Sequence, residues 1–523
     1  MPSSRRSPWL ALLTLGLVVP LSGCFAAAED CTRALTCDVG APGSGGVGGS
    51  GGAADAGPQC LDDPMNAMVA DDCGIFASSS LGDDKNAGTI DAPVKTIGQA
   101  LALAAYAKQR VYACAEIFPE AVAMPAGFTL FGGFSCTQKW AYAGSLMPTI
   151  IKPTASTIPL TLLQGAGGAI LVTDVQAEAP NASEPGASSI AALANKDAVA
   201  ELRRCNLIAN HGAAGKLGAP ADIHDMPADE GTQGKAGADA CTADMVSGGA
   251  QVKTSCGGVT SIGAHGGNGG PTSGTAGSDG QPVPVPNPLG LGLGGFGEGA
   301  GMACLEGGTG ADGANGQEAL GAHGPGHLSE LGYTGIWGQD GGVALPGQGG
   351  GGGGGRKAGV LFCGAGSKGG ASGGSGGSGG CGGKGGKGGG PGGASIALVS
   401  LTQRLTLTSC HLSAGDGGDG GPGGANQIGG APGSAGEGGM GKNGSGFGCP
   451  GGQGGKGGNG GNGGGGLGGP SIALASLYAE FPPGGDTTQT MGKAGKGGGG
   501  GNPNLMGSAG ENGIAQPTAT LLP

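Results

Sequence analysis

The sequence predicts an all-β solenoid that is interrupted by long glycine-rich excursions. An apolar phrase that begins Ser-Ile-Ala occurs three times, at 189–193, 395–399 and 471–475. Glycine supplies 132 of the 523 residues, and much of it lies between these phrases. One coil of a solenoid cannot bury its own apolar side chains, so similar coils must stack on one another. Repetition of short apolar phrases is the signal that such stacking leaves in a sequence.

The N-terminus has the features of an export signal. Two arginines precede the apolar run 9–21, which is the order of a secretory signal peptide and is too short to span a bilayer comfortably. The run ends in Leu-Ser-Gly-Cys24, which resembles the lipobox of bacterial lipoproteins. This resemblance implies a lipid on Cys24, removal of residues 1–23 and, because Phe25 follows rather than aspartate, display at the outer membrane. An ordinary signal peptide is the alternative.

Residues 24–58 are expected to form a flexible tether between the lipid and the folded part. The stretch 38–58 has no aromatic residue and no large apolar run, so it cannot offset the entropy lost on folding. From about residue 59 to 210 the composition becomes that of a folded protein. Eight of the 18 Phe, Trp and Tyr residues lie between Tyr106 and Tyr142, where the main aromatic packing is expected.

Within this folded part the apolar spacing changes from that of a helix to that of strands. Alanine and leucine at helical spacing predict a helix over 96–108. Short apolar runs at 111–115, 121–124 and 128–131, separated by proline or glycine turns, predict strands.

The stretch 80–135 resembles the N-terminal part of pectin-lyase-like proteins. The resemblance rests on Gly82-Asp83-Asp84, Gly88-Thr89, the segment 92–97, Pro119-Glu120 and the segment 127–133. It implies a right-handed parallel β-helix whose open end is capped by the predicted helix. The fold class expected from the sequence is therefore an all-β, right-handed parallel β-helix, a solenoid with an N-terminal capping helix and long glycine-rich excursions.

The predicted organisation has eight parts. They are a lipoprotein signal peptide (1–23), a tether (24–58), the cap and first coils (59–210), a glycine-rich excursion (211–393), a coil (394–416), a second excursion (417–469), a final coil (470–482) and a glycine-rich tail (483–523).

Two structures remain open for the glycine tracts. Glycine loses the most backbone entropy on ordering and has no side chain to bury, which favours disorder. The block from Gly373 to Gly393, however, reads as consecutive triplets that begin mostly with Gly-Gly. A polyproline-II-type helix has three residues per turn, so such triplets place each third side chain on one edge and let bare glycine edges pack. The tracts resemble PGRS-type surface domains and, in packing logic, glycine-rich antifreeze bundles.

The cysteine count suggests disulfides. Of 15 cysteines, 14 remain once Cys24 is set aside, which is an even number in a chain expected to be exported. No spacing matches a zinc-binding pattern. The segments ending at Ala209 and Ala414 both read Leu-x-x-Cys-x-Leu-x-Ala. If they stack in register, Cys205 and Cys410 lie about 4.8 Å apart, which is within reach of a disulfide. We state this bridge as a hypothesis.

Apparent motifs in the glycine tracts are weak evidence for chemistry. The net charge of −12 argues against nucleic acid as a partner. Ser50 and Ser375 lie in Gly-x-Ser-x-Gly but lack the strand–helix setting of a nucleophile elbow. The segment 307–312, which ends in Asp312, matches half of one calcium-binding nonapeptide without a tandem copy, and Asp416 and Asp419 lie in another glycine-rich turn. His323 and His327 flank Gly-Pro-Gly and read as loop residues. No cofactor or metal is predicted.

The sequence thus favours a lipid-anchored cell-surface protein with a structural, adhesive or matrix-contact role and no catalytic activity. The expected partners are the membrane, through Cys24, and extracellular polysaccharide or other surface proteins. One alternative is a polysaccharide lyase or hydrolase of the pectin-lyase-like type. A second is an ice-binding or glycan-binding surface. The enzyme would need acidic and basic residues on one face, and the candidates near the predicted strands are Asp174, Asp197, Glu201, Arg203 and Arg204.

Overall fold

A computed structural model of the chain describes residues 60, 63, 65, 69–106, 108–221, 226–360, 368–478, 484 and 486–523. All of these belong to one compact unit, Gly57–Pro523. Among them no helix is long and apolar enough to cross a membrane.

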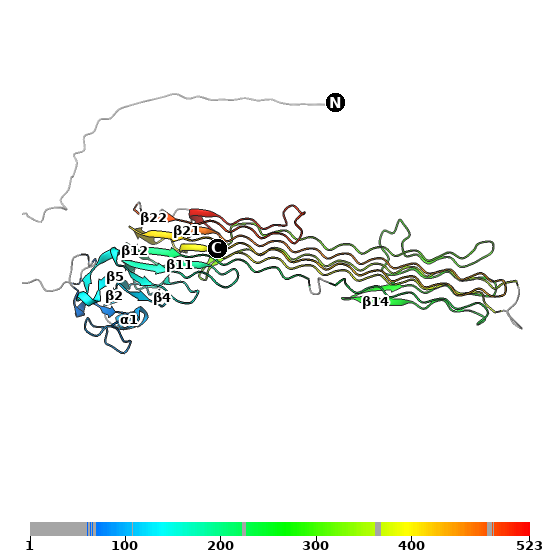
Figure 1. The fold of residues 1–523 in the computed structure, drawn as a ribbon, viewed down its shortest axis with the longest axis horizontal. Helices are drawn as coiled ribbons and strands as arrows, with labels where there is room; N and C mark the ends of the chain where they lie inside the picture. Colours follow the sequence, from blue (N-terminus) through cyan, green and yellow to red (C-terminus); the bar gives the residue numbers. More distant parts are fainter. Residues whose placement is uncertain are drawn as a thin grey trace, which may run out of the picture. The chain divides into compact units, whose positions relative to one another are not determined.

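Most strands belong to three sheets, whose pairing is parallel except for one short antiparallel strand (Figure 1). The first sheet contains β1 (Ile75–Ala77), β2 (Arg110–Cys114), β5 (Thr129–Ser135), β9 (Ile170–Thr173), β12 (Ala200–Arg203) and β19 (Leu405–Thr408), with β6 (Ala141–Tyr142) antiparallel to β5. The second contains β3 (Ile117–Phe118), β7 (Thr149–Ile151), β10 (Val175–Glu178), β13 (Asn206–Ala209), β20 (His411–Ala414) and β22 (Thr488–Thr490). The third contains β4 (Val122–Met124), β8 (Leu160–Leu162), β11 (Ser189–Ala194), β18 (Ser395–Ser400), β21 (Ser471–Ser476) and β23 (Ala515–Thr520).

The three repeated apolar phrases are neighbours in the third sheet. Ser189 pairs with Ser395, which pairs with Ser471 in the next strand. Every residue of β11, β18 and β21 is buried, because both faces of this sheet are covered. Leu398 belongs to the large cluster among the sheets, whereas Ile396 packs with Leu328 in a second cluster. Burial on both faces explains why these strands are continuously apolar rather than alternating.

One α-helix is described, and it is shorter than the predicted 96–108. The helix α1 (Ile97–Ala104) begins after Thr96, whose side chain accepts a hydrogen bond from the Gln99 N–H. The Glu120 carboxylate accepts hydrogen bonds from the first two N–H groups of the helix, at Ile97 (2.7 Å) and Gly98 (3.0 Å). These bonds satisfy donors that every helix N-terminus leaves without an intrahelical partner. Three short 3₁₀ segments complete the helical residues: Asp71–Cys73, Cys136–Gln138 and Gly144–Leu146.

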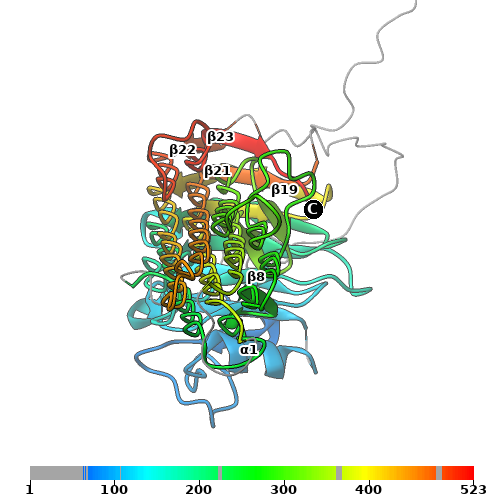
Figure 2. The ribbon, with the colours of Figure 1, turned by 90° about the vertical axis from the view of Figure 1, so that its right-hand side faces the viewer.

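The glycine-rich segments form an ordered array of extended chains, which we call the glycine array (residues 211–221, 226–360, 368–394, 415–470 and 492–513). They run side by side in Figure 1, and Figure 2 looks along them. Gly212, Gly215 and Gly218 each donate a backbone hydrogen bond to the segment that starts at Asp416, at every third residue. The same period recurs between the segments 380–392 and 455–467. Backbone groups of adjacent chains therefore satisfy one another.

Two hairpins and four disulfides lie among the described residues. The hairpins are β14 (Val252–Cys256) with β15 (Val259–Gly263), and β16 (His327–Ser329) with β17 (Gly332–Thr334). The disulfides are Cys60–Cys73, Cys114–Cys136, Cys256–Cys381 and Cys304–Cys449. The expectation of disulfide bonds is confirmed, and it fits a protein that folds in an oxidising compartment.

The predicted fold class is corrected by the arrangement of the sheets. The strands form three separate, mostly parallel sheets with few helices, and no solenoid or closed barrel is detected among the described residues, so the right-handed parallel β-helix with its capping helix is wrong. Of the two structures left open for the glycine tracts, the ordered bundle is the one observed, because the segments between the strands bond to one another along their length. Repeated phrases indicate which strands pair, but pairing alone does not fix how sheets are arranged.

Candidate functional site

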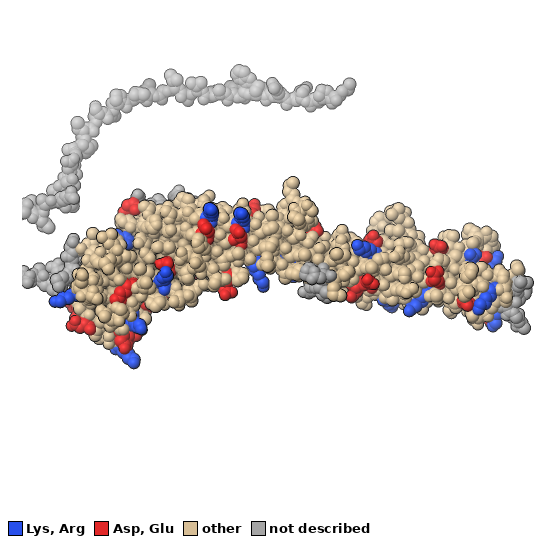
Figure 3. All heavy atoms as spheres, viewed as in Figure 1, with Lys and Arg blue, Asp and Glu red and all other residues tan. Residues whose placement is uncertain are grey.

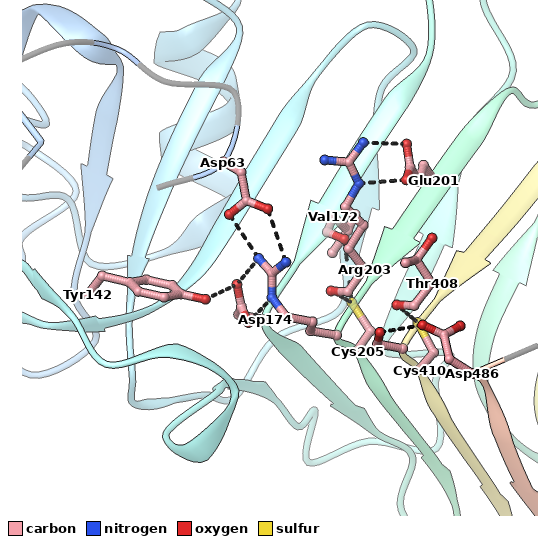
Figure 4. A network of polar contacts seen from close by, with 12 residues as sticks. Asp63, Tyr142, Val172, Asp174, Glu201, Arg203, Cys205, Thr408, Cys410 and Asp486 are labelled. Carbon is pink, nitrogen blue, oxygen red and sulfur yellow. Dashed lines mark hydrogen bonds and ion pairs between the residues drawn. The ribbon is translucent and has the colours of Figure 1, made fainter. Parts of the chain in front are cut away.

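A cluster of charged side chains lies where β9 leads into β10 and β12 into β13 (Figure 4). The Arg204 guanidinium donates to both oxygens of Asp174 at 2.9 Å, and also to both oxygens of Asp63, at 3.0 and 3.1 Å. The Tyr142 hydroxyl donates to Asp174 at 2.9 Å. Asp174 is fully buried, whereas 19% of the Arg204 side chain is exposed. The structure thus brings two of the five enzyme candidates together.

The backbone explains why these residues stand at this turn. Asp174 (φ +54°), Arg204 (φ +52°) and Ser409 (φ +52°) all adopt the left-handed conformation. The strands that follow them pair in register, so these three turn residues occupy equivalent positions in successive chains. Ser409 continues the polar series by donating to Asp486. Aspartate tolerates left-handed backbone better than most residues, which favours Asp174 at a bend.

The electrostatics of the cluster favour fixed charges. Burial, together with the hydrogen bond to Asp174, raises the pKa of Tyr142 to about 12. The hydrogen bonds to Asp174 raise the pKa of Arg204, against the opposing effect of burial. Both Asp174 oxygens accept hydrogen bonds from Arg204 or Tyr142, and the residue is fully buried, so the carboxylate is enclosed by these side chains rather than open to a substrate. The geometry is that of a structural ion cluster.

The other three enzyme candidates do not join this cluster. Glu201 and Arg203 form an ion pair with each other along β12, and hydrogen bonding to Glu201 raises the pKa of Arg203. Asp197 lies at an exposed turn, with its carboxylate 3.8 Å from Arg404. No two of the predicted carboxylates therefore face a common substrate position.

Cys205 and Cys410 lie side by side, as the sequence register predicted. They precede β13 and β20, which pair from Asn206 and His411 onward. Both are buried and are not joined by a disulfide in the structure, and each thiol donates to a backbone carbonyl: Cys205 to Arg203 and Cys410 to Leu202. Burial raises the pKa of the Cys205 thiol. Their disulfide stays a hypothesis, which peptide mapping of non-reduced protein tests: a partner other than the expected one for either cysteine contradicts it.

The remaining residues that the sequence singled out either bond to neighbouring chains or lie outside the described residues. Cys24 and Ser50 lie outside the described residues. Ser375 is buried, and its hydroxyl accepts from the Lys235 N–H at 2.7 Å. The carboxylates of Asp312, Asp416 and Asp419 each accept from a backbone N–H of a neighbouring chain, at Lys456, Lys493 and Lys496 respectively, all at 2.7 Å. His323 contacts Glu511, and His327 contacts the carbonyl of Pro523. Each of these described side chains therefore contacts another segment of the chain.

Neither a hollow beside the third sheet nor a group of possible ligands supplies an obvious site. A cavity of about 230 Å³ is lined by Ser156, Ile158, Ser188, Tyr333 and neighbouring residues. The Ser188 hydroxyl there already accepts from the Ala394 N–H. The one group of potential metal ligands among the described residues is Cys60, Asp72 and Cys73, and its two cysteines are joined by a disulfide.

Sequence reasoning missed a surface feature on the glycine array, which we call the aromatic–basic strip: Lys216, Trp337, Asp340, Lys384 and Lys387. Three adjacent chains supply it, because Gly390 donates to the Lys216 carbonyl (2.8 Å) and Gly341 donates to the Gly386 carbonyl (2.8 Å). The one sequence feature that could have indicated this strip is an isolated tryptophan in a glycine-rich tract. Its chain neighbours across the array could not be read from the sequence.

The comparisons with known proteins add no identification. No family model, no curated protein and no solved structure matches this chain.

Proposed function

We propose that this chain is a lipid-anchored cell-surface protein, attached through Cys24, with a structural, adhesive or matrix-contact role and no catalytic activity. The observation that carries the proposal is the glycine array. Its chains are joined by backbone hydrogen bonds at every third residue and by the disulfides Cys256–Cys381 and Cys304–Cys449. An array of this kind supports a stiff display surface that persists outside the cell.

The surface of the array suits contact with other molecules. Side chains project at every third residue, as in the exposed series Pro422, Ala425, Ile428 and Ala431. Lysine, arginine and acidic side chains are dispersed in small groups of both signs, with no broad field of one sign on the face drawn in Figure 3. Display of varied side chains on a rigid backbone favours an adhesive or matrix-contact role.

The enzyme alternative receives less support from the same residues. Asp174 is enclosed by Arg204 and Tyr142, and Glu201 is paired with Arg203 along its own strand. A lyase or hydrolase needs carboxylates or a base that are free to meet the substrate. The paired arrangement of these residues favours a role in stabilising the sheets over a role in catalysis.

The proposal is tested in cells of a Gram-negative host that express the full chain or its Cys24→Ala variant. We expect the parent chain in the outer membrane fraction, cleaved by protease added outside, and the variant without lipid and released from the membrane. Cells with the parent should also adhere to polysaccharide-coated surfaces more than cells without it. Release of unsaturated or reducing ends from the polymer would contradict the non-catalytic role.

A further inference from the structure

The cavity beside the third sheet has walls from three separate segments. The bend at 156–158, which precedes β8, forms one wall. Residues between β10 and β11, together with the start of β11, form the second. The β16–β17 hairpin forms the third, through Leu331 in its turn and Tyr333 in β17. Segments far apart in the sequence thus enclose one space of about 230 Å³.

The hairpin wall is held in place by its neighbours. Leu328 packs with Ile190 in the second apolar cluster, and its N–H donates to the Leu522 carbonyl at 2.8 Å. Gly332 is left-handed (φ +99°), and a Cβ there would lie 2.6 Å from the Ile190 Cδ1, so the turn rests directly on β11. Leu331, beside it, lines the cavity and is 93% exposed. The wall is therefore fixed, and the cavity can be reached from solvent.

No charged side chain is among the described residues that line this cavity. The lining residues are serine, threonine, glycine, alanine, proline, isoleucine, leucine and one tyrosine. Burial raises the pKa of Tyr333, whose hydroxyl donates to the Pro325 carbonyl at 3.2 Å, so this residue is neutral as well. A charged ligand would lose hydration here without gaining a counter-charge. The lining thus favours a ligand without charge.

Several polar groups of the lining can still bond to a ligand. The Ser188 hydroxyl accepts a hydrogen bond from the Ala394 N–H at 2.9 Å, which leaves its own hydrogen to donate. Ser156 and Thr157 are exposed, and the Thr157 hydroxyl contacts a backbone carbonyl of its own bend at the long distance of 3.5 Å. The Ser189 hydroxyl, by contrast, both donates and accepts within the fold. The available hydroxyls therefore come from two of the three walls.

We propose that this cavity binds one neutral hexose unit, either free or at a chain end or branch of a polysaccharide. Leu331 and Tyr333 would lie against its C–H groups, and the available hydroxyls would bond to its own hydroxyls. This inference rests on the proposed surface-contact function and names its ligand class. A sugar ring combines polar edges with a face of polarised C–H groups, which suits the negative face of an aromatic ring. A wholly apolar ligand would leave the hydroxyls of the cavity without partners.

The size of the cavity limits the ligand to one ring. A cavity of about 150 Å³ can hold one benzene molecule, so about 230 Å³ admits a single six-membered ring with substituents. Pockets that enclose larger ligands measure about 300 to 1,000 Å³. A polysaccharide would therefore place one end or branch inside and the rest of its chain outside.

The test measures binding of glucose, galactose and mannose to the full chain by saturation-transfer NMR and calorimetry. The detergent used in purification must lack a sugar head group, because such a group would itself compete for the cavity. We expect at least one hexose to bind with a millimolar dissociation constant, as is usual for so small a ligand. Glucuronate and glucosamine, which are charged, should bind about tenfold more weakly. Competition by dextran, galactan or mannan would identify a polysaccharide source, and binding of the free hexose alone a free sugar.

Substitutions in the hairpin test the apolar wall. Tyr333→Ala should weaken hexose binding about tenfold, as expected for loss of an aromatic contact. Tyr333→Phe should retain binding, because the Tyr333 hydroxyl bonds to Pro325 rather than to a ligand. Leu331→Ala should weaken binding about threefold. Leu289→Ala is its matched control, because Leu289 is 80% exposed on the glycine array, and it should leave affinity unchanged.

The polar wall has its own pair of variants. Ser156→Ala should weaken binding about threefold, as expected for loss of one hydrogen bond between neutral groups. Ser434→Ala, at an exposed position of the array, should have no effect. Matching circular dichroism and disulfide maps would show that the variants fold.

Contrary results would overturn the proposal in two ways. If no hexose binds the parent, or if glucuronate or glucosamine binds as tightly as the best hexose, the ligand class is wrong. If a hexose binds the parent and both Tyr333→Ala and Leu331→Ala equally well, the cavity is not the site. Either result leaves the proposed surface attachment and adhesion standing, because these are measured separately in the cell experiments.

Discussion

The sheets and the glycine array stabilise extended chains in opposite ways. The largest fully buried side chains all lie in the sheet region, from Phe76 to Ile170, and aromatic rings there stack on one another, as Phe76 does on Tyr112 at 5.2 Å. In the array, chains approach so closely that glycine is required, and backbone hydrogen bonds replace the apolar core. One region depends on what its side chains add, and the other on their absence.

The largest expected effect comes from adding a single methyl group inside the array. A Cβ at Gly376 would lie 1.9 Å from the Gly350 carbonyl oxygen, which belongs to a neighbouring chain bonded on both sides. Neither chain can move without breaking its hydrogen bonds. We expect Gly376→Ala to lower the free energy of unfolding by about 4 to 5 kcal/mol, measured by denaturant titration.

The control for this substitution is Gly499→Ala in the same array. No atom lies within 4 Å of a Cβ at Gly499, and its backbone is not left-handed. We expect a change within about 0.5 kcal/mol. Equal effects at the two positions would show that glycine acts through chain flexibility rather than through close packing.

Disulfides should matter more in the array than at the end of the sheet region. The bond Cys256–Cys381 joins residues 125 apart in the sequence, whereas Cys60–Cys73 joins residues 13 apart. A longer closed loop restricts the unfolded chain more. We expect removal of the first bond by a double Cys→Ala change to cost about 5 kcal/mol, and removal of the second about 3 kcal/mol. The reverse order in thermal unfolding would indicate that strain outweighs loop entropy.

In the sheet region, the buried ion pair of Asp174 with Arg204 can be tested by removing its negative charge. Asp174→Asn keeps the shape and the left-handed backbone but removes the charge that faces Arg204. Because Asp63 still neutralises Arg204, we expect a loss of about 2 kcal/mol, which is less than for a fully isolated buried charge. Asp197→Asn is the control, since Asp197 is also left-handed but its pair with Arg404 is exposed. A similar loss of unfolding free energy at both positions would show that burial of the ion pair does not determine its contribution.

The repeats in the sequence predicted pairing better than architecture. The Ser-Ile-Ala phrases indicated neighbours, and Ser189, Ser395 and Ser471 do align. The shared Leu-x-x-Cys pattern likewise placed Cys205 beside Cys410. Neither pattern records how three sheets are arranged, and the family resemblance led to the wrong fold class.

The candidate sites show the same limit. The clustering of Asp174 with Arg204 depends on two turns that stack 30 residues apart, and no local pattern marks that contact. The position of Trp337 against Gly390 depends on which glycine chains are adjacent. Triplets in these tracts repeat with little variation, so the sequence permits many alignments and does not select one.

The smallest expected effect concerns acid stability in the sheet region. Glu116 accepts hydrogen bonds from the hydroxyls of Ser78, Ser79 and Ser80 and from the Ser80 N–H. Burial acts to raise the pKa of Glu116, but these bonds together lower it below its usual value. A carboxyl whose pKa is lower in the folded state stabilises the fold at neutral pH, and this contribution disappears as pH falls through the folded-state pKa.

Glu116→Gln should therefore reduce the melting temperature at pH 7 and have progressively less effect in acid. Below the folded-state pKa of Glu116, the parent and the variant should unfold at similar temperatures, because both then carry a neutral side chain. Glu330→Gln serves as the control, since Glu330 is exposed in the turn of the β16–β17 hairpin. A difference between parent and Glu116→Gln that persists unchanged into acid would mean that shape, rather than charge, determines the contribution of this residue.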